Sequence, residues 1–152
     1  MVQTVPPRSE IPVEMTWDLE SVFATDQAWE ENFTFVSQQL PKLAQLQGSL
    51  GQTAQALLQA MQLSDQVAEV LGRLLVYATM RYHEDTTRTH YQALSDRAAT
   101  LAAEANTATA FFVPEILAIP PERLESYFAQ ESGLALYRHQ IDEEPKDAEG
   151  AA

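Results

Sequence analysis

Histidine and the carboxylates beside it are the side chains of this sequence that could bind a metal or transfer protons. Of the three His residues, one is followed directly by an acid, in His83-Glu84. A helical metallopeptidase site places two His four residues apart, with a Glu directly after the first. The residue four positions after His83 is Thr87, and a hydroxyl does not replace an imidazole ligand. A solvated polar turn is therefore favoured here over a zinc site.

The other candidate groups show no catalytic pattern either. The adjacent pairs Glu30-Glu31 and Glu84-Asp85 point in different directions if they are helical, so they do not form an acid–base dyad. His90 is expected at the edge of an apolar stripe and His139 on the surface. There is no Cys, no Ser in a G-x-S-x-G setting and no glycine-rich phosphate loop. We predict no catalytic, cofactor-binding or metal-binding residue in these 152 residues.

Composition restricts the partners and the compartment. The formal net charge is −13, and the nine Lys and Arg form no patch that could match phosphates. These facts argue against nucleic acid and anionic membranes as partners. No apolar run approaches a membrane span, and no signal peptide is recognisable. The lack of Cys fits a reducing compartment, so a cytoplasmic location is expected.

Apolar spacing predicts an all-α fold, an antiparallel array of about five or six helices. Pro41 should kink or end the first helix, and Thr53 and Ser64 should cap two separate helices after it. Pro114, Pro120 and Pro121 should break the chain before a helix that starts near Pro121. The apolar faces read from the sequence are Trp29, Phe33, Val36, Leu40 and Leu43; Val67, Leu71, Leu74 and Ala78, widened by Val70, Leu75 and Tyr77; Tyr91, Leu94, Ala98, Leu101, Ala105, Ala108 and Phe112; Leu124 and Phe128; and Leu136, Tyr137 and Ile141.

Three parts are expected along the chain: an extended N-terminal arm over 1–24, a helical domain over 25–143 and a disordered acidic tail over 144–152. Proline disfavours helix near the start, so the chain up to Thr16 should be extended. Trp17 should anchor the arm by packing onto the core. Asp18 can cap a short turn, and Thr25 or Asp26 the first long helix.

The polar segment Arg81–Thr87 is the densest group of hydrogen-bonding side chains in the sequence. The favoured interpretation is a corner between two helices, held by caps and an Arg–carboxylate pair. A surface that meets another domain or a peptide is the alternative.

Four stretches, in this order, carry a family resemblance. They are RSEIPVEMTWDLESVFATDQAWE, LGRLLVYATMRYHEDTTRTHYQALSDRA, FFVPEILAIPPERLESYF and GLALYRHQIDE. They resemble the N-terminal region of oligoendopeptidase F, a zinc metallopeptidase of the thimet oligopeptidase group. The resemblance covers about Arg8 to Glu143, and the TWDL arm and the YATMRYHEDTT corner are its most specific parts.

The resemblance implies a mostly helical, clam-shell enzyme with a deep channel that cleaves short peptides. The N-terminal helical region would form part of the channel wall and limit access. The family's zinc-binding HExxH helix and its third ligand, a Glu, would lie several hundred residues further on, so zinc belongs to the parent family's catalytic domain. No residue here matches that motif, and no catalytic role is carried over.

We therefore expect the N-terminal, non-catalytic scaffold and gating part of such a peptidase. Its expected partners are the missing C-terminal catalytic domain and, in the whole enzyme, oligopeptides. The ending EEPKDAEGAA departs from the family pattern, which suggests a truncation, a frameshift or a split gene product. The alternatives are a stand-alone helical interaction module, which could self-associate through uncovered apolar surface, and a non-functional fragment.

Overall fold

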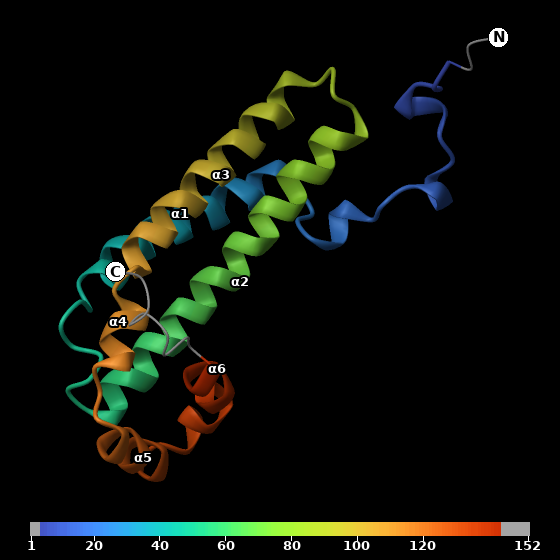
Figure 1. Cartoon of the computed structure of the whole chain (residues 1–152). Helices are drawn as coiled ribbons and strands as arrows, with labels where there is room; N and C mark the ends of the chain where they lie inside the picture. Colours follow the sequence, from blue (N-terminus) through green and yellow to red (C-terminus); the bar gives the residue numbers. More distant parts are fainter. Residues whose placement is uncertain (1–3, 144–152) are drawn as a thin grey trace, which may run out of the picture. The chain divides into compact units, whose positions relative to one another are not determined.

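A computed structural model of the chain describes residues 4–143 (Figure 1). Within those residues there are α-helices and 3-10 turns but no strand, which confirms the all-α prediction. No helix in this part is both long and apolar enough to cross a bilayer. The predicted tail 144–152 lies outside the described residues. The helices are α1 (Asp26–Ala44), α2 (Ala54–Glu84), α3 (Thr89–Thr109), α4 (Phe112–Leu117), α5 (Pro121–Gln130) and α6 (Arg138–Glu143), and the 3-10 turns are η1 (Arg8–Glu10), η2 (Val13–Met15), η3 (Leu19–Ser21) and η4 (Ser132–Tyr137).

The chain divides into two compact units. Unit 1 combines residues up to 37 with residues 69–103, and unit 2 combines residues 38–68 with those from 104 onward. The three long helices α1, α2 and α3 each contribute one part to each unit. Unit 1 also contains the N-terminal arm, and unit 2 the short helices α4, α5 and α6.

In unit 1, the first turns of α1 and the first half of α3 lie against the last turns of α2 (Figure 1). The indole nitrogen of Trp29 donates to the carbonyl oxygen of Leu74 at 3.0 Å, so the fully buried ring keeps its polar atom paired. The predicted apolar faces supply the buried side chains: Trp29, Val36, Leu71, Leu74, Tyr77, Ala78, Tyr91, Leu94, Ala98 and Leu101.

In unit 2, the connection between α1 and α2 packs against α4 and α5. The Tyr127 hydroxyl donates to the carbonyl of Gly51 at 2.8 Å. The two carboxylate oxygens of Glu115 accept the backbone N–H groups of Gly48 and Leu50. Gly48 has φ +85°, a left-handed conformation that favours glycine. These bonds fix the loop that leads into α2.

The arm differs from its predicted form. Residues before Thr16 form the turns η1 and η2 instead of an uninterrupted extended chain. Trp17 is 55% exposed, so the prediction that it anchors the arm is wrong. Leu19 and Phe23 are buried instead, and Phe23 packs edge-on against Tyr77 with ring centroids 5.6 Å apart. Asp18 stands at the start of η3 but makes no side-chain cap bond.

Some predicted helix ends are confirmed and others are wrong. The Thr25 and Thr53 hydroxyls accept the backbone N–H groups of Ala28 and Ala56, as cap residues do. Ser64 begins no new helix, because α2 runs without a break through it. α1 continues three residues beyond Pro41, to Ala44.

Two further predictions fail in unit 2. Pro114 lies inside α4, in its first turn, where a proline costs no helical hydrogen bond. Leu136 is 86% exposed, whereas Leu134 and Tyr137 are buried, because a 3-10 turn replaces the predicted last helix at these positions. α5 begins at Pro121 as predicted.

Candidate functional site

The predicted corner at the end of α2 is built around Arg81, in unit 1. Its Nη1 donates to Glu84 at 3.2 Å and its Nη2 to Glu20 of the arm at 2.9 Å. Arg8 of the arm donates to the other Glu84 oxygen at 3.0 Å. The side chains of Arg81 and Glu84 are only 15% and 10% exposed, so the removal of one partner would leave the other charge nearly buried. The predicted Arg–carboxylate pair is present, and it also binds the arm.

Hydrogen bonds raise the pKa of Arg81 despite its burial. Burial alone would lower the pKa of its guanidinium, but the bonds to Glu20 and Glu84 and the nearby Tyr77 outweigh burial and raise that pKa above its ordinary value. The same bond from Arg81 lowers the pKa of Glu20. Both groups are therefore charged at neutral pH, and neither is poised to transfer a proton.

The turn after α2 is closed by Asp85. Its carboxylate accepts the backbone N–H of Thr87 at 3.1 Å and the Thr87 hydroxyl at 2.6 Å. These bonds lower the pKa of Asp85, since they favour the charged carboxylate. The interpretation of Arg81–Thr87 as a capped corner thus agrees with its geometry.

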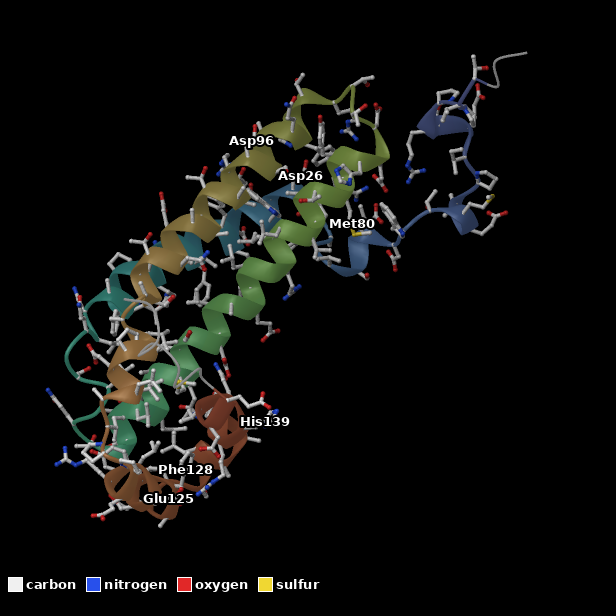
Figure 2. All side chains as sticks on the ribbon, viewed as in Figure 1. Asp26, Met80, Asp96, Glu125, Phe128 and His139 are labelled. Atoms are coloured by element: carbon white, nitrogen blue, oxygen red, sulfur yellow. The ribbon has the colours of Figure 1, made fainter. Side chains whose placement is uncertain are left out.

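A second polar centre lies at the start of α1, where Figure 2 labels Asp26 close to α2 and α3. The Asp26 carboxylate accepts the Tyr77 hydroxyl at 2.7 Å and the Tyr91 hydroxyl at 3.2 Å. Nε2 of His90 lies 3.1 Å from its other oxygen. One carboxylate thus joins the first turn of α1 to α2 and α3.

The pKa of the Asp26 carboxyl group is lowered, whereas the pKa values of the two phenols are raised. Burial alone would raise the pKa of Asp26, but the bonds from Tyr77, His90 and Tyr91 outweigh it and lower that pKa. Burial and the hydrogen bond to Asp26 raise the pKa of Tyr77 to about 12, and burial raises that of Tyr91. At neutral pH both phenols stay protonated and Asp26 stays ionised, which suits a structural junction.

Arg97 of α3 makes a third set of polar contacts in unit 1, with α1. Its two terminal nitrogens donate to the two Glu30 oxygens at 2.6 and 2.8 Å. Its guanidinium lies 5.1 Å from the ring centre of Trp29 and 4.4 Å from that of Phe33. Arg97 therefore covers the edge of the buried Trp29 while it pairs its charge.

The donor groups do not fit zinc in the described chain. His83 lies in the last turn of α2, and both oxygens of the neighbouring Glu84 are taken by arginines. His90 pairs with Asp26, and His139 with Glu143 at 3.1 Å. Among residues 4–143, no group of three or more His, Asp or Glu side chains is placed to hold a metal ion.

Two hollows lie along the arm in unit 1. They measure about 170 and 260 Å³, and Arg8, Thr16 and Trp17 line both. Met15 lines the smaller one and Val13 the larger one. With its arginines paired and apolar side chains exposed, this region is suited to holding surfaces together.

The comparison of folds identifies the class. The chain superposes with a TM-score of 0.79 on a solved structure of a putative peptidase from Chlamydophila abortus, at 22% identity, over 93% of this chain and 24% of that one. It superposes with a TM-score of 0.71 on the solved oligoendopeptidase-F from Enterococcus faecium, at 33% identity, over 78% of this chain and 23% of that one. The fold is therefore that of about a quarter of each of these longer chains.

Sequence comparison gives the family. The chain is 41% identical to oligopeptidase PepF of Bacillus subtilis over 94% of its own length and 21% of that protein. It is 30% identical to group B oligopeptidase PepB of Streptococcus agalactiae, over 87% of its own length and 22% of that protein. No family model matches. As the sequence analysis predicted, the chain is homologous to one part of the oligoendopeptidase F proteins, and it spans about a fifth of the length of these relatives.

The sequence analysis missed three sets of contacts in these networks: the pairing of Arg8 with Glu84, the pairing of Glu20 with Arg81, and the Tyr77–Asp26–Tyr91 junction. The residues that they join are 51 to 76 positions apart. The sequence did show an Asp at a helix start and two tyrosines on predicted buried faces, and buried tyrosines need a hydrogen-bond acceptor. It identified the participants but not their pairing.

Proposed function

We propose that this chain is the non-catalytic helical part of an oligoendopeptidase F-type metallopeptidase, where it serves as a scaffold and limits which peptides reach the catalytic site. In this proposal the zinc, its ligands and the oligopeptide substrates belong to the catalytic domain beyond this chain. The proposal includes a cytoplasmic location, as the sequence analysis expects.

The observation that carries the proposal is the match over nearly the whole chain to about a fifth of an oligopeptidase. The sequence itself supports the non-catalytic part. Its single His-Glu pair is followed by Thr87 where a metallopeptidase helix needs a second His, and Glu84 is held by two arginines. The scaffold part is supported by the ion pairs and capped turns of unit 1.

The absence of activity can be tested on the purified chain. A quenched fluorescent oligopeptide is incubated with the chain and added zinc, with the Bacillus subtilis oligopeptidase as a positive control. We expect no turnover above that of buffer. Turnover that a chelator removes and zinc restores would contradict the non-catalytic assignment.

The gating role requires the complete enzyme context. A chimera in which this chain replaces the matching fifth of the Bacillus subtilis oligopeptidase is compared with the same chimera carrying Y82A, H83A and T86A at the corner. We expect these substitutions to change the ratio of kcat/KM between a shorter and a longer peptide. The exposed change Q92A serves as the matched control on the next helix. An unchanged ratio in a stable triple variant would reject the gating role.

A further inference from the structure

The N-terminal arm displays apolar side chains to solvent. Val13 is 82%, Met15 76% and Trp17 55% exposed. We call these three residues the arm patch. Val5 is 90% exposed in the same segment, and elsewhere in residues 4–143 the large exposed hydrophobics are the scattered Val76, Leu117 and Leu136. A group of exposed apolar side chains within a few residues is the mark of a surface that another surface covers.

The arm patch stands on a segment that is fixed to unit 1 at both ends. Arg8 pairs with Glu84 before the patch, and Glu20 pairs with Arg81 after it. Leu19 and Phe23 are buried directly after Trp17. Between these points the backbone is ordered by the turn η2, in which the Met15 and Thr16 N–H groups bond to Pro12 and Val13. The exposure is therefore built into a held conformation.

Charge around the arm patch restricts what can cover it. Glu10, Glu14 and Asp18 are exposed beside it, whereas the two nearby cations, Arg8 and Arg81, are already paired with Glu84 and Glu20. A covering surface should therefore be apolar at its centre and carry Lys or Arg at its rim. A second copy of this chain would bring the same acidic rim and a net charge of −13 against it.

We propose that the arm patch is the docking site for the catalytic polypeptide of the peptidase, which offers it an apolar hollow bordered by basic side chains. This inference rests on the proposed function. Its occupant follows from two facts: the relatives are four to five times longer than the part matched here, and the acidic rim disfavours a second copy. Docking through the arm would also connect the catalytic part to the corner, because Arg81 and Glu84 hold the arm.

The test is oxidative footprinting with hydroxyl radicals, read peptide by peptide. The isolated chain provides its own scale, since Met61 is 4% exposed against 76% for Met15, and Trp29 is fully buried against 55% for Trp17. In the isolated chain Met15 and Trp17 should oxidise much faster than Met61 and Trp29. In the chimera with the Bacillus subtilis oligopeptidase, their rates should fall to those of the buried pair.

A substitution provides the second arm of the test. M15S should leave the thermal midpoint of the isolated chain unchanged, because Met15 is largely exposed there, and should lower the midpoint of the chimera. L136S is the matched control: Leu136 is 86% exposed and lies outside the arm, so it should lower neither midpoint.

The outcomes separate this inference from the proposed function. A chimera that hydrolyses peptides while Met15 oxidises as fast as in the isolated chain overturns the docking site and leaves the proposed function standing. If the chimera does not fold, footprinting of the arm segment in the intact Bacillus subtilis enzyme decides: protection supports the docking site, and exposure overturns it. Protection of Met15 that grows with the concentration of the isolated chain, together with a dimer in sedimentation, assigns the patch to a second copy and also overturns it.

Discussion

Asp26 shows how one carboxylate can organise three helices in unit 1. It lies in the first turn of α1, where negative charge is favourable, and it accepts hydroxyls from α2 and α3. Tyr77 is 1% exposed and Tyr91 6%, so both phenols need an internal acceptor. Loss of its charge and of one acceptor oxygen would leave the two buried hydroxyls with a weaker acceptor.

We predict that D26N destabilises the chain near neutral pH by about 1–2 kcal/mol, a modest loss because the carboxylate is 39% exposed. The pKa of Asp26 is lowered from 3.8 in the folded chain, so its ionised form stabilises the fold above that pH. This contribution disappears as the pH falls through the lowered pKa. Urea unfolding of wild type and D26N from neutral pH downward should therefore show two curves that converge below pH 3.8.

The control for this prediction is D96N. Asp96 is exposed on α3 (Figure 2), and it takes no part in the ion pairs described above for residues 4–143. D96N should stay within about 0.5 kcal/mol of wild type, as surface changes generally do. Equal unfolding midpoints for D26N and D96N near neutral pH would refute the role of Asp26.

At the scale of the element, the backbone conformation decides the effect of a glycine. Gly48 has φ +85° in the loop before α2, whereas Gly72 lies within α2. An added Cβ meets no heavy atom within 4 Å at either position. The two sites thus differ in backbone strain and helix propensity, without a steric difference.

The same substitution should consequently have opposite signs at the two sites. G48A should destabilise by about 1–2 kcal/mol, because a left-handed alanine is strained. G72A should stabilise by about 0.5–1 kcal/mol, because alanine favours the helix interior. Thermal and urea unfolding of both variants provide the measurement, and a change of the same sign in both would contradict this account.

The sequence predicted the buried faces of the helices better than it predicted where the helices begin and end. Apolar spacing identified the buried faces around Trp29, Leu74 and Ala98, because burial of a helix follows its period. It failed at Ser64, because a possible cap contributes only about 1 kcal/mol against an apolar face that continues from Leu57 through Val67 and Leu74.

The exposure of Trp17 and the pairing of Asp26 follow from contacts between distant segments. Leu19 and Phe23 are buried where Trp17 was expected to be, and Phe23 packs against Tyr77 of α2. The Asp26 partners are 51 and 65 residues away. Local pattern identifies such residues as polar or aromatic, but it does not select one partner among several candidates.

Charge is the dominant property of the whole molecule. The sequence contains 22 acidic and nine basic residues, for a formal net charge of −13. In the described part, Arg8, Arg81, Arg97 and Arg138 are each paired with carboxylates. The remaining acidic excess repels itself in the compact state and favours unfolding.

Salt should therefore stabilise this chain. An increase in NaCl from about 0.01 M to about 0.15 M shortens the Debye length from about 30 Å to about 8 Å, which screens the repulsion. The same salt weakens the exposed ion pairs, but each of these contributes only about 0–1 kcal/mol. The ion pairs are also fewer than the uncompensated acidic charges. The urea midpoint should rise with NaCl, and it should rise less in E69Q/E104Q, which removes two exposed charges from α2 and α3. A midpoint that falls with salt would mean that the ion pairs, above all those that hold the arm to the corner, outweigh the net repulsion.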